Sequence, residues 1–193
     1  MSRAHVLDLV GTLARLGLAA VWLVSGTLKA IDLDQTVVAV RAYDVLPRAA
    51  VDVVAALLPF LEIALGLLLL LGIGTRLVAV VSGGLLLVFI AGVTQAWARG
   101  LSIDCGCFGG GGAVAPGATA YVQEIVRDVG FLALVAWLVV RPHTLLSMDA
   151  AYRGKDLTWV ERHGASASGA RRRPRNGWPR RGSRCRRSAP TRR

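Results

Sequence analysis

Cys105 and Cys107 are separated by one glycine in the segment Ile-Asp-Cys-Gly-Cys-Phe-Gly, residues 103–109. A disulfide between them would close a very small ring, and a disulfide that departs from the preferred geometry is strained and easier to reduce. Strained, exposed disulfides are typical of labile or catalytic bonds. Gly106 carries no side chain that would hinder the tight turn. The spacing therefore indicates dithiol–disulfide chemistry.

Other roles for the two cysteines are open at this point. A structural disulfide is the main alternative, because cysteines outside the cytoplasm normally pair. A closed structural zinc site needs four ligands, and no second cysteine or histidine pair lies nearby in the sequence, so we expect no metal. Incidental cysteines in a tight glycine turn are the remaining alternative. Arg99 would favour a thiolate here, whereas Asp104 would oppose it.

The composition is that of an integral membrane protein. Of the 193 residues, 54% are hydrophobic, and the mean hydropathy is +0.52, which is too apolar for a soluble domain of this size. The net charge of +11 belongs to the C-terminal tail, because residues 164–193 hold 11 of the 23 basic residues and no acidic residue. The remainder of the chain is neutral overall.

Four apolar stretches predict four transmembrane helices. Each is close to the ~20 residues needed to cross the hydrocarbon core. They run from about Leu7 to Ala30, Val51 to Gly72, Leu77 to Ala98 and Thr119 to Val140. The fourth is the weakest, because its first half contains Glu124, Arg127 and Asp128. Arg15 interrupts the first stretch, which we interpret as a retained helix and not as a signal peptide.

We expect an all-α fold, an integral membrane four-helix bundle with a disordered basic C-terminal tail. Residues 1–142 would form the transmembrane domain, residues 143–163 a cytoplasmic juxtamembrane segment, and residues 164–193 the Arg-rich tail. The tail has little to bury and would contact anionic lipid; its basic clusters alone are weak evidence for nucleic-acid binding. The loop of residues 31–50 could hold a short interfacial helix that caps the bundle.

Basic residues near the helix ends predict the orientation in the plasma membrane. Arg3, Arg76 and Arg141 lie at one end of the expected bundle, together with the tail, and this end is expected in the cytoplasm. The loop of residues 31–50 at the other end carries Arg41 and Arg48, so the bias is moderate and the tail decides much of it. Both termini would then be cytoplasmic, and the Cys105–Cys107 loop would face the oxidising compartment, where disulfides persist.

Ionisable side chains inside a membrane bundle are costly and often functional. Arg15 and Glu62 lie at similar depths in antiparallel helices, given a rise of ~1.5 Å per residue. We expect them to form a buried structural ion pair that fixes the helix register.

A second polar group is expected beneath the cysteine loop. Glu124, Arg127 and Asp128 share one face of the fourth helix at positions i, i+3 and i+4, and Lys29 ends near the same depth. Lys29, Arg127 and Asp128 are therefore a candidate site for a quinone head group or for proton transfer. A self-satisfied charge network is an equal alternative.

Several motifs resemble those of DoxX-like and MauE-like membrane proteins. They are Trp22-Leu-Val-Ser25-Gly26-Thr-Leu-Lys29, whose named residues share one helix face, and Leu58-Pro59-Phe-Leu-Glu62-Ile-Ala-Leu-Gly66. The segment Asp104-Cys105-Gly-Cys107-Phe108-Gly109, followed by Arg127-Asp128, is specifically similar to MauE, the methylamine utilisation membrane protein. The resemblance covers about residues 8–142. It implies a four-helix membrane bundle that serves maturation of the methylamine dehydrogenase small subunit, or of another disulfide-containing protein, alongside a thioredoxin-like partner.

Our first hypothesis is a membrane component of extracytoplasmic thiol–disulfide exchange. Cys105 and Cys107 would be the catalytic pair, a thioredoxin-like protein outside the cytoplasm the partner, and a membrane quinone a candidate electron acceptor. The alternatives are a non-catalytic membrane anchor or scaffold for a soluble redox enzyme, and a quinone-linked DoxX-like oxidoreductase subunit. No internal repeat supports a transporter, although such a four-helix unit could form a homodimer.

Overall fold

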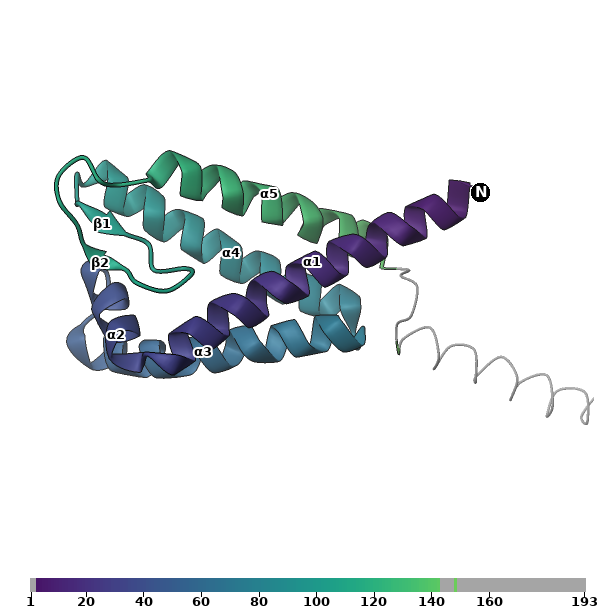
Figure 1. Cartoon of the computed structure of the whole chain (residues 1–193), viewed down its shortest axis with the longest axis horizontal. Coiled ribbons are helices and arrows are strands. Elements are labelled where there is room, and N and C mark those ends of the chain that lie inside the picture. The colour runs from purple at the N-terminus through teal and green to yellow at the C-terminus, as the bar shows by residue number, and fades with distance from the viewer. Residues whose placement is uncertain (1–2, 143–147, 149–193) are drawn as a thin grey trace, which may run out of the picture. The chain divides into compact units, whose positions relative to one another are not determined.

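Five helices and one two-stranded sheet occur within residues 3–142, which, with Met148, are the residues that the computed structural model describes (Figure 1). The helices are α1 (Arg3–Ile31), α2 (Leu33–Ala42), α3 (Arg48–Leu71), α4 (Thr75–Ala98) and α5 (Tyr121–Val140), and the strands are β1 (Ile103–Asp104) and β2 (Gly112–Ala113). The expected juxtamembrane segment and Arg-rich tail lie outside the described residues.

The fold is that of an all-α membrane protein, as predicted. Helices α1, α3 and α4 are long and apolar enough to cross a membrane, and each carries large apolar side chains that are exposed on the protein surface. Such side chains would contact lipid. Helix α5 has the length to span, but Glu124, Arg127 and Asp128 make its first half polar. A fourth span therefore stays a prediction.

Helices α1 and α3 pack closely and antiparallel because small residues lie at their contact. A Cβ atom added to Gly26 would lie 2.8 Å from the carbonyl oxygen of Pro59, and one added to Gly66 would lie 2.7 Å from the side chain of Leu23. The absence of side chains at both glycines lets the two backbones approach, which is how membrane helices gain packing contacts. Helix α3 continues through Pro59.

A tight turn joins α3 to α4. Gly72 adopts a left-handed conformation with φ of 68° and ends α3, while the backbone N–H of Ile73 donates to the carbonyl of Leu68. This pattern satisfies carbonyl groups that the end of a helix leaves without partners. From the turn, α3 and α4 diverge toward the opposite end of the bundle (Figure 1). We call that opposite end, which carries α2 and the strands, the loop end.

The buried core ties the remaining helices together. The Trp22 indole of α1 donates to the Ser82 hydroxyl of α4 at 3.1 Å, and its ring lies 6.3 Å from that of Phe89. Gly83 of α4 lies against Val135 of α5, where an added Cβ would approach to 3.0 Å. The apolar core around these contacts includes Leu18, Ala19, Leu65, Leu69, Ala79, Leu86 and Leu138.

Helix α2 is the short capping helix that the sequence predicted in the first loop. The Asp32 side chain caps it by accepting from the Gln35 backbone N–H at 2.9 Å. The cysteine segment folds back onto this helix as a hairpin in which β1 pairs antiparallel with β2. Gly106 and Gly111 both have positive φ, and added Cβ atoms would approach the Ala39 side chain to 2.9 and 2.6 Å. Glycine therefore lets the cysteine segment lie directly on α2.

We predict that Gly26→Ala lowers stability by about 1–3 kcal/mol, the usual cost of overpacking a tight contact. The new methyl group would meet backbone atoms of α3, which cannot move independently. Thermal unfolding in detergent would measure the loss. Gly17→Ala is the matched control in the same helix, because nothing lies within 4 Å of its added Cβ. Equal stability of the two variants would contradict the close contact.

Candidate functional site

A buried ionic network lies between α1 and α3 at the level of the cysteine loop. The Lys29 ammonium lies 2.8 and 2.9 Å from the two carboxylate oxygens of Glu62 and 2.7 Å from the Ser25 hydroxyl. Glu62 is 0% exposed, Ser25 3% and Lys29 7%. A buried ion pair is tolerated only when its remaining hydrogen-bonding capacity is used, and here the neighbouring hydroxyl and backbone supply partners.

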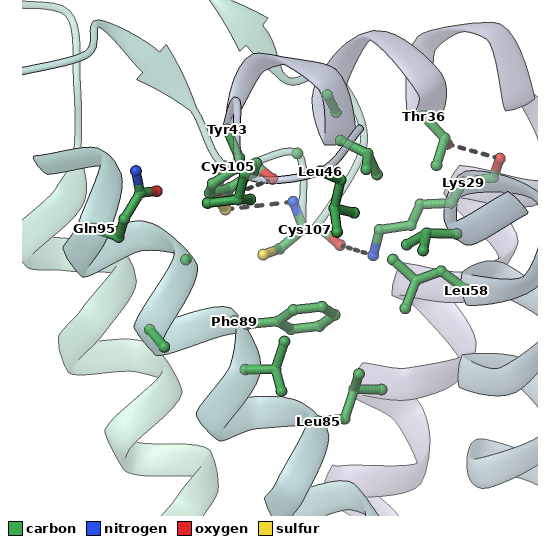
Figure 2. Close-up of a pocket in the computed structure, with 18 residues that line it drawn as sticks. Lys29, Thr36, Tyr43, Leu46, Leu58, Leu85, Phe89, Gln95, Cys105 and Cys107 are labelled. Carbon is green, nitrogen blue, oxygen red and sulfur yellow. Dashed lines mark hydrogen bonds between the residues drawn. The ribbon is translucent and has the colours of Figure 1, made fainter. Parts of the chain in front are cut away.

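The same network holds the backbone of the cysteine pair. The Cys107 carbonyl oxygen lies 2.6 Å from the Ser25 hydroxyl and 3.3 Å from the Lys29 ammonium (Figure 2). The hydroxyl also lies 2.9 Å from Glu62, so its single proton serves one of these two acceptors at a time. The position of Cys107 is thus coupled to the packing of α1 on α3.

The predicted Arg15–Glu62 ion pair is wrong. Glu62 pairs with Lys29, whereas Arg15 donates to the carbonyl oxygens of Leu69 and Leu70 at 3.0 and 3.3 Å. Those carbonyls end α3, where orphan acceptors and the helix dipole favour a cation. Eight residues separate Glu62 from Leu70, about 12 Å along the helix. The prediction assumed that the two residues lie equally far from the same end of the bundle. This was wrong because α1 runs beyond the end of α3 where the turn to α4 begins (Figure 1).

Cys105 and Cys107 are free thiols held close together. The Cys107 backbone N–H points to the Cys105 sulfur, with 3.4 Å between the two atoms. Cys105 is buried and Cys107 is the more exposed of the two residues. The Tyr43 hydroxyl donates to the Cys105 carbonyl at 3.1 Å, and burial raises the pKa of Tyr43, which keeps this donor protonated. Both cysteine carbonyls are therefore fixed by hydrogen bonds.

The surroundings of the two thiols are unequal. The Cys107 thiol donates to the Cys105 sulfur, and this lowers the pKa of Cys105 although burial opposes the shift; the Cys107 backbone N–H and Arg127 also favour the thiolate. The same interaction, together with burial, raises the pKa of Cys107. The guanidinium of Arg127 lies 3.8 Å from the Cys105 sulfur and 4.9 Å from the Phe108 ring centre. Cys105 is thus the thiol that ionises first.

Two carboxylates of α5 lie beside this pair. Asp128 accepts from Arg127 at 3.1 Å through one oxygen. Its other oxygen and one oxygen of Glu124 are buried without a hydrogen-bond partner among the described residues. The expected polar face of α5 therefore points to the cysteine loop, with unused acceptor capacity close to the thiols.

Three candidate metal ligands also meet at Cys105. Ligand atoms of Asp104, Cys105 and Glu124 lie within 4.8 Å of one another. This trio is one ligand short of a closed zinc site, and the Arg127 guanidinium brings a positive charge to the same sulfur. The charge arrangement favours a thiolate paired with arginine over a bound cation.

A cavity of about 480 Å³ adjoins the thiols between α2, α3 and α4. Figure 2 shows Cys105, Cys107 and Gln95 at one end of it, with Phe89 and Leu85 at the other. The walls are mostly apolar. Of the three residues expected to form a quinone site, Lys29 lines this cavity, whereas Arg127 and Asp128 are not among its lining residues.

One protein-family model matches most of the chain. The family described as methylamine utilisation protein MauE matches residues 7–141. The chain belongs to the MauE family. No curated protein and no solved structure matches the chain. The matched residues contain the whole ionic network and the cysteine loop, so these features lie within the MauE domain, while the wider likeness to DoxX-like proteins stays a prediction.

Sequence reasoning missed three residues of this MauE-family site. Gln35 of α2 donates to the Gly111 carbonyl at 2.7 Å. Tyr43, at the C-terminus of α2, donates to the Cys105 carbonyl. Gln95 projects from α4 toward the cavity (Figure 2). A polar amide near the end of an apolar helix was a usable signal for Gln95. Nothing in the sequence alone indicated that α2 lies under the hairpin.

We predict strong coupling between Lys29 and Glu62. Lys29→Met leaves the carboxylate buried without its counter-ion, and we expect it to cost about 3–5 kcal/mol of stability. Lys29→Met/Glu62→Gln should lose much less than the sum of the two single changes, measured by reversible unfolding in mixed micelles. The exposed pair Arg41–Asp52 is the control, since its removal should change stability little. Additive losses at Lys29 and Glu62 would refute the coupling.

We also predict that the Cys107 side chain sets the ionisation of Cys105. Cys185 is the third cysteine of the chain and lies in the C-terminal tail, so it is replaced by serine to leave only the two loop thiols. In this Cys185→Ser background, Cys107→Ser keeps a hydroxyl donor and Cys107→Ala removes it. Because the hydrogen bond stabilises the thiolate, the midpoint of the pH profile for alkylation of Cys105 should be higher in Cys107→Ala than in Cys107→Ser. Alkylation rates with a small neutral reagent would locate both midpoints. Equal midpoints in the two variants would contradict a hydrogen bond from the Cys107 side chain to Cys105.

Proposed function

We propose that this MauE-family protein is a membrane component of thiol–disulfide redox maturation, with Cys105 and Cys107 as the reacting pair. The observation that carries the proposal is that the protein holds two free thiols side by side through separate contacts to each cysteine. The buried ionic network donates hydrogen bonds to the Cys107 carbonyl, and the Arg127 guanidinium lies 3.8 Å from the Cys105 sulfur. A cysteine needed only to fill a turn would not require a charged partner at its sulfur.

In the proposed reaction, a Cys105–Cys107 disulfide oxidises a dithiol of the partner. A partner thiolate attacks the Cys107 sulfur, a mixed disulfide forms, and Cys105 leaves as a thiolate. The second partner thiol then displaces Cys107, so the partner gains a disulfide and this chain becomes a dithiol. The greater exposure of Cys107 and the Arg127 guanidinium beside the Cys105 sulfur support this order, since a nearby cation stabilises the thiolate that leaves.

We infer that the loop end faces the compartment outside the cytoplasm. Arg3, Arg76 and Arg141 near the opposite end are matched in number by Arg41, Arg48 and Arg99 near the loop end. The basic residues after Arg141 therefore decide the bias, which favours the cytoplasm for both termini. The partner would then be a thioredoxin-like protein outside the cytoplasm. Family membership supports a role in methylamine utilisation, and maturation of the disulfide-containing small subunit of methylamine dehydrogenase is the substrate we propose within it.

Labelling of the thiols in intact cells tests this proposal. We would use a Cys185→Ser variant and a membrane-impermeant, mass-tagged thiol reagent, with and without mild reduction. We expect two tags after mild reduction and fewer before it, because the pair would cycle between disulfide and dithiol outside the cytoplasm. Cys105→Ser/Cys107→Ser is the control and should take no tag.

Two results would contradict the proposal. Resistance to reductant until the protein unfolds would indicate a structural disulfide. Tagging only after permeabilisation would place the pair in the cytoplasm. In a host that depends on the protein, Cys105→Ser or Cys107→Ser should also abolish function, whereas full function of the double variant would favour a non-catalytic scaffold.

A further inference from the structure

The cavity beside the thiols has the size and polarity of a ligand site. Its volume of about 480 Å³ lies within the range of ~300–1,000 Å³ that is usual for small-molecule pockets. Apolar side chains, among them Leu58, Leu85 and Phe89, form most of the wall. Cys105 and Cys107 line one end (Figure 2). A ligand in the cavity would therefore contact the reacting groups.

The cavity is accessible from the surface that would face lipid. Val54 of α3 and Val88 of α4 line it and are 37% and 65% exposed. Both belong to helices that are long and apolar enough to span a membrane, and these helices diverge toward the loop end (Figure 1). A hydrophobic molecule dissolved in the bilayer could enter between them without crossing water.

One polar group at the thiol end lacks a partner. The side-chain oxygen of Gln95 is buried and accepts no hydrogen bond from any described residue. That oxygen is closed off from the cavity, because almost none of its surface is accessible, so a ligand would meet the amide nitrogen instead. The amide nitrogen of the same side chain can donate to a ligand carbonyl. Gln95 therefore fits a ligand that carries a carbonyl group.

We propose that this cavity binds the head group of a lipophilic quinone, which reoxidises the Cys105–Cys107 dithiol. The inference rests on the proposed thiol–disulfide function and names its electron acceptor. Gln95 would hydrogen-bond one quinone oxygen, the ring would lie near Phe89, and the isoprenoid tail would leave between α3 and α4. This position differs from the site expected around Arg127 and Asp128, which lie on α5.

The proposed step is balanced. The two S–H bonds of Cys105 and Cys107 break and one S–S bond forms, which releases two electrons and two protons. The quinone takes both electrons, and its two oxygens take the protons, so that one hydroquinone forms per disulfide.

A phospholipid acyl chain is the competing occupant. It would fill the apolar part of the cavity, but it has no group to pair with Gln95 and cannot accept electrons from a dithiol. The amide donor of Gln95 and the two adjacent thiols therefore favour the quinone. The experiment separates the two, because only the quinone yields hydroquinone and a disulfide.

Decylubiquinone is a suitable probe, because its ring has no free position for thiol addition. Reduced Cys185→Ser protein in lipid nanodiscs would be mixed with the probe without oxygen. We expect one hydroquinone and one Cys105–Cys107 disulfide per chain. Gln95→Leu should weaken the reaction about tenfold in apparent affinity, as expected for one lost hydrogen bond of about 1–1.5 kcal/mol.

Two tryptophan variants of α4 provide a matched pair. Ala91 lines the cavity, whereas Leu87 is exposed on the same helix and is not among the lining residues. Ala91→Trp should reduce hydroquinone formation at least tenfold, and Leu87→Trp should leave it unchanged. Both variants should still exchange with a water-soluble aromatic disulfide, which shows that the folded loop remains reactive.

The outcomes distinguish this inference from the proposed function. No hydroquinone, with normal exchange against the soluble disulfide, would overturn the quinone site and leave the thiol–disulfide role intact. Equal loss in Ala91→Trp and Leu87→Trp would overturn the location of the site. Failure of the thiols to react with either oxidant would overturn both proposals.

Discussion

The buried contact of Lys29 with Glu62 is the interaction on which the rest of the site depends. Removing two charges from solvent costs several kcal/mol per ion, and mutual attraction offsets this only when the remaining hydrogen-bonding groups are used. Ser25 and the Cys107 carbonyl supply those partners. Because α1 and α3 contribute the charges, the packing of two membrane helices and the position of the redox loop form one cooperative unit.

The loop in turn makes two chemically similar thiols unequal. The Cys107 backbone N–H and the Arg127 guanidinium of α5 both approach the Cys105 sulfur. Glycines with positive φ allow the hairpin to lie on Ala39 of α2, so that the pair adjoins both the polar face of α5 and the apolar cavity. One sulfur is thus prepared to leave as a thiolate and the other to be attacked.

Hydrophobic periodicity predicted much of the fold but little of its register. Apolar length identified the long helices. The depth of Arg15 relative to Glu62 was misjudged because the sequence does not say how far α1 extends beyond α3. The hairpin was missed for a similar reason: its contact with Ala39 is long-range, and glycine-rich sequence carries no strand pattern. Lys29 and the cysteines were found because their residue types are rare in apolar surroundings.

The central claim is that the Cys105–Cys107 pair is redox-active in the folded membrane protein. The most direct test is its reduction potential in lipid nanodiscs, measured by equilibration with glutathione buffers and mass-tagging in a Cys185→Ser background. We predict one two-electron transition, with a potential above about −270 mV, because structural disulfides typically have potentials below about −300 mV. A potential below about −300 mV, or reduction only after unfolding, would contradict a role in exchange.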